Sequence, residues 1–133
     1  MIETQTAAET TVLRGYQAFA TADMETLAEL FHPDIVWTHH NDDRFGGPKA
    51  GWPAVARYFA ESAELTAGSL EARVESTTAS GELVAVGARM IGTRPDGRRF
   101  DDPQMHLFRL RDGRVVQVDQ YVGDPAAVAA FWA

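Results

Sequence analysis

The chain has 133 residues, of which 45% are hydrophobic and 23% are charged. These values are typical of one globular domain with its own core, so we expect a single domain over residues 1–133. Twelve basic and nineteen acidic residues give a net charge of −7. That balance argues against partners such as nucleic acid or an anionic membrane, because both need a basic surface.

The chain contains no cysteine, which excludes disulfides, thiolate metal sites and a cysteine nucleophile. Its N-terminus lacks the basic start and apolar run of a signal peptide, and no stretch of 18 apolar residues occurs. We therefore expect a cytoplasmic protein.

The first half of the chain has helical spacing. Apolar residues between Val12 and Ala20 recur at i, i+4, i+7 and i+8, which predicts a first helix. Asp23 is a typical N-cap, so a second, short helix should follow it and end at His32-Pro33. A third helix should open at Pro53, and a last one should span Pro125 to Trp132.

Alternating hydrophobicity predicts the strands. The first is expected over Asp34 to His40, and the polar stretch from Asn41 to Gly51 is interpreted as a loop. The second half predicts four more strands joined by tight turns, over Leu70–Ala79, Leu83–Thr93, Arg98–Leu110 and Arg114–Val122. Helices followed by an antiparallel meander imply an α+β fold, in which a curved sheet and N-terminal helices enclose a pocket.

Three stretches carry motifs: Tyr16–Trp37 with its Phe31-His32-Pro33-Asp34 run, Gly51–Leu70, and His106–Asp124. Together they resemble SnoaL-like domains, within the wider superfamily of ketosteroid isomerase and nuclear transport factor. The resemblance implies a cystatin-like conical barrel that usually forms a homodimer through its sheet. It also implies a largely apolar cavity for a small hydrophobic ligand, with neither metal nor organic cofactor.

Tyr16, His39 and His106 are the candidate catalytic residues. The resemblance places Tyr16 where ketosteroid isomerases have a tyrosine that donates to the substrate oxyanion, and His39 where they have a general-base aspartate. His106 matches a histidine of SnoaL-type polyketide cyclases. Strand alternation puts both histidines on inner faces, where two imidazoles in one cavity can serve as acid and base. We expect His39 to be the base or acid, and His106, with Tyr16 or Gln120, to stabilise the developing oxyanion by hydrogen bonds. The alternative is that each histidine is hydrogen-bonded within the protein and takes no part in catalysis.

Apolar side chains and one amide are expected to bind the substrate: Trp37, Trp52, Met90, Phe108, Val118 and Gln120. Gln120 departs from the polyketide cyclases, which carry an acid–base aspartate at the matching place. Glutamine cannot take a proton at neutral pH, and Asp119 should face the opposite side of the sheet unless a bulge turns it inward. The pair Asp101-Asp102 is within reach of the mouth of the pocket, but adjacent carboxylates at the start of a strand more often face solvent, so exposure is the preferred interpretation.

The loop that begins at His39 and ends at Arg44 holds imidazoles and carboxylates, which are ligands for zinc or iron. His39 and His40 should point to opposite faces, however, so no metal is expected and an Asp43–Arg44 contact is preferred. Gly46-Gly47 lacks the other residues of a phosphate-binding loop.

The chain is therefore predicted to be a cofactor-independent enzyme that moves a proton next to a carbonyl. Isomerisation, cyclisation or dehydration of a small hydrophobic compound, such as a polyketide or a steroid-like molecule, would fit. One alternative is a module that binds a small molecule or a protein without catalysis, since this fold hosts both. A second is an epoxide hydrolase, although the Asp–Arg–Asp set of those members is not found on the expected inner faces.

Overall fold

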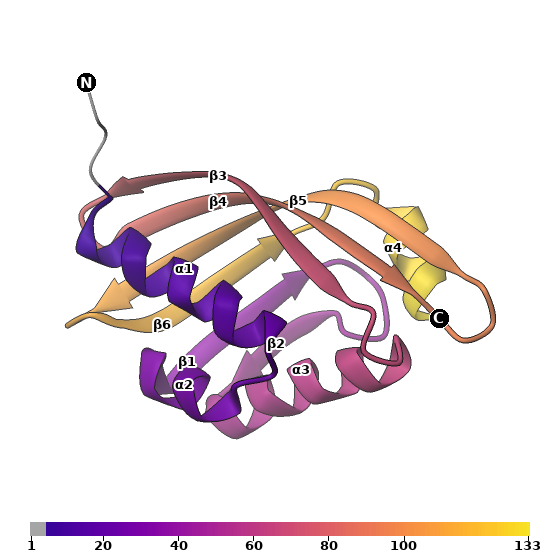
Figure 1. Ribbon diagram of the computed structural model, residues 1–133, viewed down its shortest axis with the longest axis horizontal. Helices are drawn as coiled ribbons and strands as arrows, with labels where there is room; N and C mark the ends of the chain where they lie inside the picture. The colour runs from indigo at the N-terminus through magenta and orange to yellow at the C-terminus, as the bar shows by residue number, and fades with distance from the viewer. Residues whose placement is uncertain (1–4) are drawn as a thin grey trace.

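A computed structural model describes residues 5–133, which form a curved sheet with three helices on its concave side and a fourth at one end (Figure 1). In chain order the elements are α1 (Ala7–Ala20), α2 (Met24–Leu30), β1 (Phe31–His40), β2 (Gly47–Ala50), α3 (Trp52–Leu65), β3 (Glu71–Ser80), β4 (Leu83–Thr93), β5 (Arg99–Arg111), β6 (Arg114–Tyr121) and α4 (Pro125–Trp132). The predicted α+β, cystatin-like class is confirmed. None of the helices within the described residues is long and apolar enough to cross a bilayer.

The sheet has the strand order β2-β1-β6-β5-β4-β3. Its pairs are antiparallel except for β1 and β6, which run parallel. The four late strands lie within one residue of the predicted bounds. This order places β1, from the first half of the chain, directly beside β6 from its end.

The loop predicted over Asn41 to Gly51 is wrong in part, because its second half forms β2. Strand β2 has only four residues and lies at the edge of the sheet, where it pairs with β1 from Val36↔Ala50 to His39↔Gly47. So short a segment has no room for an alternating pattern, and a sequence rich in glycine and proline disguises it further.

Local hydrogen bonds explain where the helices begin. Thr6 and Glu9 form a capping box at the start of α1. Asp23 accepts from the backbone N–H of Thr26 and caps α2, as predicted. Asp124 caps α4 in the same way.

The sheet bends where β3 carries a bulge between Val74 and Ser76. Gly87 lies opposite on β4, and a Cβ there would come within 2.6 Å of the Ser76 hydroxyl. This is the role expected of a glycine inside a strand. Both β3 and β4 contact α1, so this part of the sheet closes the space against the helix.

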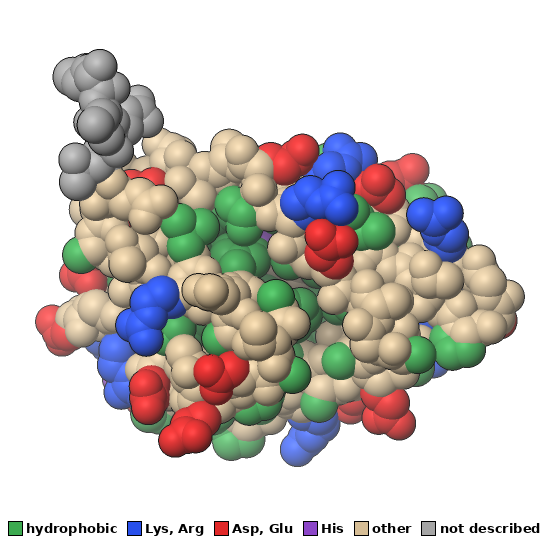
Figure 2. All heavy atoms as spheres, in the orientation of Figure 1, with side chains coloured by type: hydrophobic (Ala, Val, Ile, Leu, Met, Phe, Trp, Pro, Cys, Tyr) green, Lys and Arg blue, Asp and Glu red, His purple; other side chains and the backbone are tan. Residues whose placement is uncertain are grey.

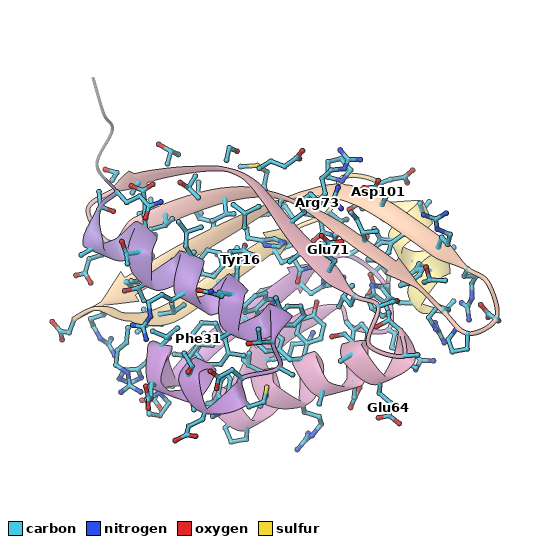
Figure 3. The ribbon with its side chains drawn as sticks, viewed as in Figure 1. Tyr16, Phe31, Glu64, Glu71, Arg73 and Asp101 are labelled. Carbon is cyan, nitrogen blue, oxygen red and sulfur yellow. The ribbon has the colours of Figure 1, made fainter. Side chains whose placement is uncertain are left out.

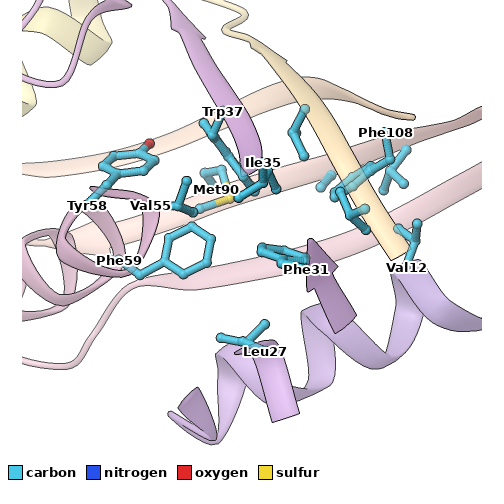
Figure 4. Packing of buried hydrophobic residues seen from close by; sticks show 14 of the residues in the cluster. Val12, Leu27, Phe31, Ile35, Trp37, Val55, Tyr58, Phe59, Met90 and Phe108 are labelled. Atoms are coloured by element: carbon cyan, nitrogen blue, oxygen red, sulfur yellow. The ribbon is translucent and has the colours of Figure 1, made fainter. Parts of the chain in front are cut away.

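Buried hydrophobic side chains, aliphatic and aromatic, fill that space (Figure 4). Phe59 packs edge-on against Trp37 at 5.1 Å between ring centroids, and Phe31 packs against both helical and sheet residues. Edge-to-face pairs of this kind stabilise a core beyond their simple burial. The same aromatic cluster forms one wall of the cavity described next.

Candidate active site

A cavity of about 60 Å³ lies between α1, α3 and the sheet. Figure 2 shows the hollow on the molecular surface, with hydrophobic side chains around and inside it. Its apolar wall consists of Val12, Phe19, Leu27, Phe31, Trp37, Phe59, Leu70, Ala72, Met90 and Phe108, together with Gly15. Its polar groups are Tyr16, Tyr58, Ser62, His106 and Gln120. An apolar pocket with a few polar groups is the usual form of a small-molecule site.

His39, Gln120 and His106 form a row across three neighbouring strands. Gln120 on β6 is the register partner of His39 on β1 and of His106 on β5. All three side chains are buried. With strands spaced about 4.8 Å apart, the two histidine backbones lie about 10 Å from each other. Both imidazoles therefore lie on the inner face that strand alternation predicts.

Tyr16 and His106 meet at the deep end of the cavity. The hydroxyl of Tyr16 lies 2.6 Å from Nδ1 of His106, and Figure 3 shows Tyr16 between α1 and the sheet. Burial lowers the pKa of His106 to about 4, and the charge of His39 adds to this effect. Burial also raises the pKa of Tyr16. At neutral pH both side chains are therefore uncharged.

A network of amides continues behind this pair. Nε2 of His106 lies 3.0 Å from Oε1 of Gln104, which also accepts from Nε2 of Gln120 at 2.8 Å. Oε1 of Gln120 accepts from the Trp37 indole at 3.0 Å and from the Tyr58 hydroxyl at 2.9 Å. Buried polar groups that all have partners form a rigid frame, because breaking one bond leaves a group unsatisfied.

Asp102 anchors the network, and its predicted exposure is wrong. Only Asp101 faces solvent, where it pairs with Arg89 at 2.7 Å. Asp102 is buried and accepts from the amide of Gln104 at 3.0 Å. Asp101 and Asp102 are consecutive residues of β5, so their side chains point to opposite faces of the sheet. Asp102 lies on the buried inner face and Asp101 on the outer face.

His39 does not line the cavity, although it faces inward. Its Nε2 lies 2.8 Å from Oδ2 of Asp43, and its Nδ1 lies 3.5 Å from the Tyr58 hydroxyl. Burial tends to raise the pKa of Asp43, but hydrogen bonds from His39, Asn41 and a backbone N–H outweigh it, so the pKa lies below its usual value. Tyr58 thus separates His39 from the cavity, and the preferred Asp43–Arg44 contact is replaced by a buried pair with His39.

The other expected substrate-binding residues divide into two groups. Trp37, Met90, Phe108 and Gln120 line the cavity, whereas Trp52 and Val118 do not. Val118 is fully buried in the core. Trp52 packs edge-on against Phe31, with ring centroids 5.5 Å apart. Periodicity identifies the buried face of an element, but it does not say which buried residue borders empty space.

Asp119 points away from the cavity. Its carboxylate lies 2.8 Å from Nε2 of His40 and accepts from Gln117, on the outer face of the sheet. Residues 117–121 of β6 pair in unbroken register with β1 and β5, so no bulge turns Asp119 inward. The position at which the resemblance to polyketide cyclases implies an acid–base aspartate is therefore occupied in this cavity by Gln120.

Comparison with known proteins places the chain in a family. The model of the SnoaL-like domain matches residues 12–118. The chain belongs to the SnoaL-like family. It is 34% identical over 109 residues to the nogalonic acid methyl ester cyclase of Streptomyces nogalater, a match that covers 74% of this chain and 77% of the cyclase. An uncharacterized protein of Mycobacterium tuberculosis is 27% identical over 124 residues, which cover 92% of this chain and 93% of that protein.

Solved structures agree with this family fold. Bal32a, from a soil-derived mobile gene cassette, superposes with a TM-score of 0.92 at 30% identity and covers 96% of this chain and 97% of its own. A protein of unknown function with a cystatin-like fold, from Xanthomonas campestris, gives a TM-score of 0.88 at 25% identity, covering 95% and 98%.

Three polar residues in or behind the cavity of this SnoaL-like protein were not predicted as site residues from its sequence. Tyr58 follows Val55 at helical spacing, and Gln104 alternates with His106 along β5, so each had a detectable pattern. Ser62 lines the cavity from α3. No three His, Asp or Glu side chains within residues 5–133 are gathered closely enough to hold a metal ion.

Proposed function

We propose that this SnoaL-like protein is an enzyme of the isomerase or cyclase type that transfers a proton next to a carbonyl of a small, neutral, hydrophobic compound. The observation that carries the proposal is the 2.6 Å contact between the Tyr16 hydroxyl and His106 Nδ1 at the deep end of an aromatic cavity. The cyclase relative, whose name specifies a methyl ester, is consistent with a neutral substrate.

The proton path runs through both side chains. The oxygen of Tyr16 takes a proton from the substrate carbon while the hydroxyl hydrogen of Tyr16 passes to His106 Nδ1. The electron pair of the broken C–H bond moves into the carbonyl, whose oxygen becomes an enolate. Tyr16 then gives the proton that it took from carbon to this oxygen while the imidazolium returns its Nδ1 hydrogen to Tyr16, so a neutral enol forms and both side chains regain their starting states. Tyr16 never becomes a free phenolate, which its raised pKa would disfavour.

The low basicity of His106 limits the substrate. A base whose pKa is about 4 can accept a proton at a useful rate only from a strongly activated carbon, because proton transfer slows as the pKa gap widens. A carbon between two carbonyl groups has this activation. We therefore propose a β-dicarbonyl unit at the reacting end of the substrate.

The test uses 2-acetylcyclohexanone, a compact neutral β-dicarbonyl compound whose keto–enol interconversion is followed by ultraviolet absorbance. We expect the protein to accelerate the interconversion, and Tyr16→Phe to lower kcat/KM by about a hundredfold or more, the usual contribution of a positioned proton-transfer group. Tyr121→Phe is the matched control, because Tyr121 lies on the outer face of the sheet and does not line the cavity.

Equal acceleration by the wild type and by Tyr16→Phe would contradict this mechanism. Binding of the compound without any acceleration would instead favour the non-catalytic binding module. A diol formed from an epoxide probe, with labelled oxygen from water, would favour the hydrolase.

A further inference from the structure

We propose that Asp102, acting through Gln104, fixes the direction of the hydrogen bonds at the deep end of the cavity. As a result, the oxygen of Tyr16 accepts a hydrogen bond from the ligand, and the site selects a neutral enol or phenol hydroxyl. The inference rests on the function proposed above, because an enol is what proton transfer next to a carbonyl produces. It assigns roles to two residues that do not touch the cavity.

The direction is set first at Asp102. Its Oδ2 accepts from the backbone N–H of Gly123 at 3.0 Å, and its Oδ1 accepts from that of Asp124 at 2.9 Å. Both oxygens therefore act as acceptors, and Gln104 must present its amino group to reach Oδ2, also at 3.0 Å. The two backbone donors cannot reverse, so the orientation of the Gln104 amide is fixed.

The carbonyl oxygen of Gln104 then decides the tautomer of His106. This oxygen can only accept, so Nε2 of His106, 3.0 Å away, must carry the hydrogen. Burial keeps His106 neutral, which leaves Nδ1 without a hydrogen. The hydroxyl of Tyr16, 2.6 Å from Nδ1, must therefore donate to it.

Gln120 is oriented by the same logic. One N–H of its amide donates to Gln104 Oε1, so its own carbonyl oxygen faces the Trp37 indole and the Tyr58 hydroxyl, which both donate to it. The hydrogens of Trp37, Tyr58 and Tyr16 are all committed to protein acceptors. What Tyr16 offers to the cavity is the free lone pair of its oxygen.

This polarity defines the ligand. A hydroxyl group can donate to the Tyr16 oxygen, whereas a carboxylate or an enolate would face another lone pair. The described residues that line the cavity include no lysine or arginine to offset such a charge, and burial of an unpaired anion is costly. The resemblance to ketosteroid isomerases implied that Tyr16 donates to an oxyanion; here Asp102 reverses that direction.

The first measurement is nitrogen NMR of the protein labelled at histidine. We expect His106 to show a protonated Nε2 and a bare Nδ1 at neutral pH. A protonated Nδ1 would overturn the proposal whatever the catalytic activity, since Tyr16 would then have to accept from His106.

The second measurement compares the affinities of p-cresol, which has a donor hydroxyl, and p-methylanisole, whose ether oxygen only accepts. We expect the wild type to bind p-cresol about tenfold more tightly, which corresponds to one good hydrogen bond. Absence of this preference, including failure of p-cresol to bind, would overturn the proposal.

Asp102→Asn tests the positioning role. The asparagine amide disturbs the orientation of Gln104, so we expect a mixture of His106 tautomers and loss of the preference for p-cresol. Asp101→Asn is the matched control, because Asp101 is the neighbouring carboxylate on the outer face. Retention of both tautomer and preference in Asp102→Asn would contradict the role of Asp102.

If Asp102→Asn fails to fold, Gln104→Met replaces it, because methionine matches the length of glutamine without its acceptor. These readouts do not require turnover. The two proposals can therefore fail separately. If the tautomer and the binding preference are as expected but the keto–enol interconversion of 2-acetylcyclohexanone is not accelerated, the proposed function is disproved and this inference stands.

Discussion

Burial of His106 makes the stability of the folded protein depend on pH. The folded chain holds this side chain neutral down to pH about 4, while the unfolded chain takes up a proton at its ordinary pKa of 6.5. Between these values the unfolded state binds more protons. The contribution of His106 to the free energy of unfolding is therefore fully present above pH 6.5 and is lost as the pH decreases toward 4. The loss amounts to about 3 kcal/mol.

Urea unfolding at pH 7 and at pH 4 measures this loss. His106→Asn should show a smaller loss by about that amount, because the other titrating groups are common to both proteins and cancel in the comparison. Equal losses in the two proteins would contradict the pKa of His106 on which the proposed proton path depends.

Among the elements, α1 carries a glycine that the helix does not require. Gly15 lies inside the helix, and a Cβ there would meet only Phe31, at an ordinary 3.9 Å. Gly15→Ala should raise the free energy of unfolding by about 1 kcal/mol, because alanine loses less backbone entropy in a helix. Thermal unfolding measures the gain, and since Gly15 lines the cavity, weaker binding of p-cresol should accompany it.

Gly123 is the opposite case, at the connection from β6 to α4. A Cβ there would come within 2.4 Å of the Pro103 carbonyl oxygen and 3.1 Å of Asp102 Oδ1. Gly123→Ala should therefore destabilise the protein by about 1–3 kcal/mol, as overpacking usually does. A gain in stability from this change would contradict the close approach of Gly123 to Pro103 and Asp102.

At the scale of the whole molecule, the outer face of the sheet has two large exposed hydrophobic side chains. Met105 and Tyr121 are cross-strand partners on β5 and β6 and are 52% and 46% exposed. We propose that a second copy of the chain covers them, which keeps both cavities open on the other side. Exposed apolar patches commonly mark such interfaces.

Met105→Glu should convert this dimer to a monomer, because it buries an unpaired charge in the interface. Sedimentation velocity measures the change. Ala60→Glu, on the exposed face of α3, is the control and should leave the dimer intact. A wild-type protein that stays monomeric at all concentrations would disprove the pairing.

The sequence by itself determined the local structure and the side of each strand. The periods of hydrophobicity, the N-cap Asp23 and the glycine turns act over a few residues, so they predict the helices, the late strands and the inward direction of His39, His106 and Gln120. The motifs predicted the family, because they extend over most of the chain.

Only the tertiary structure decided which inward residues meet. Tyr16 and His106 are 90 positions apart in the chain, and their contact depends on how α1 crosses the sheet. The parallel pairing of β1 with β6 puts Gln120 between the two histidines, and Tyr58 from α3 then closes the cavity in front of His39. Hydrogen-bond direction is equally non-local, because the backbone at Gly123 sets it and a chain of hydrogen bonds through Asp102 carries it to Tyr16. No periodic pattern in the sequence predicts this chain.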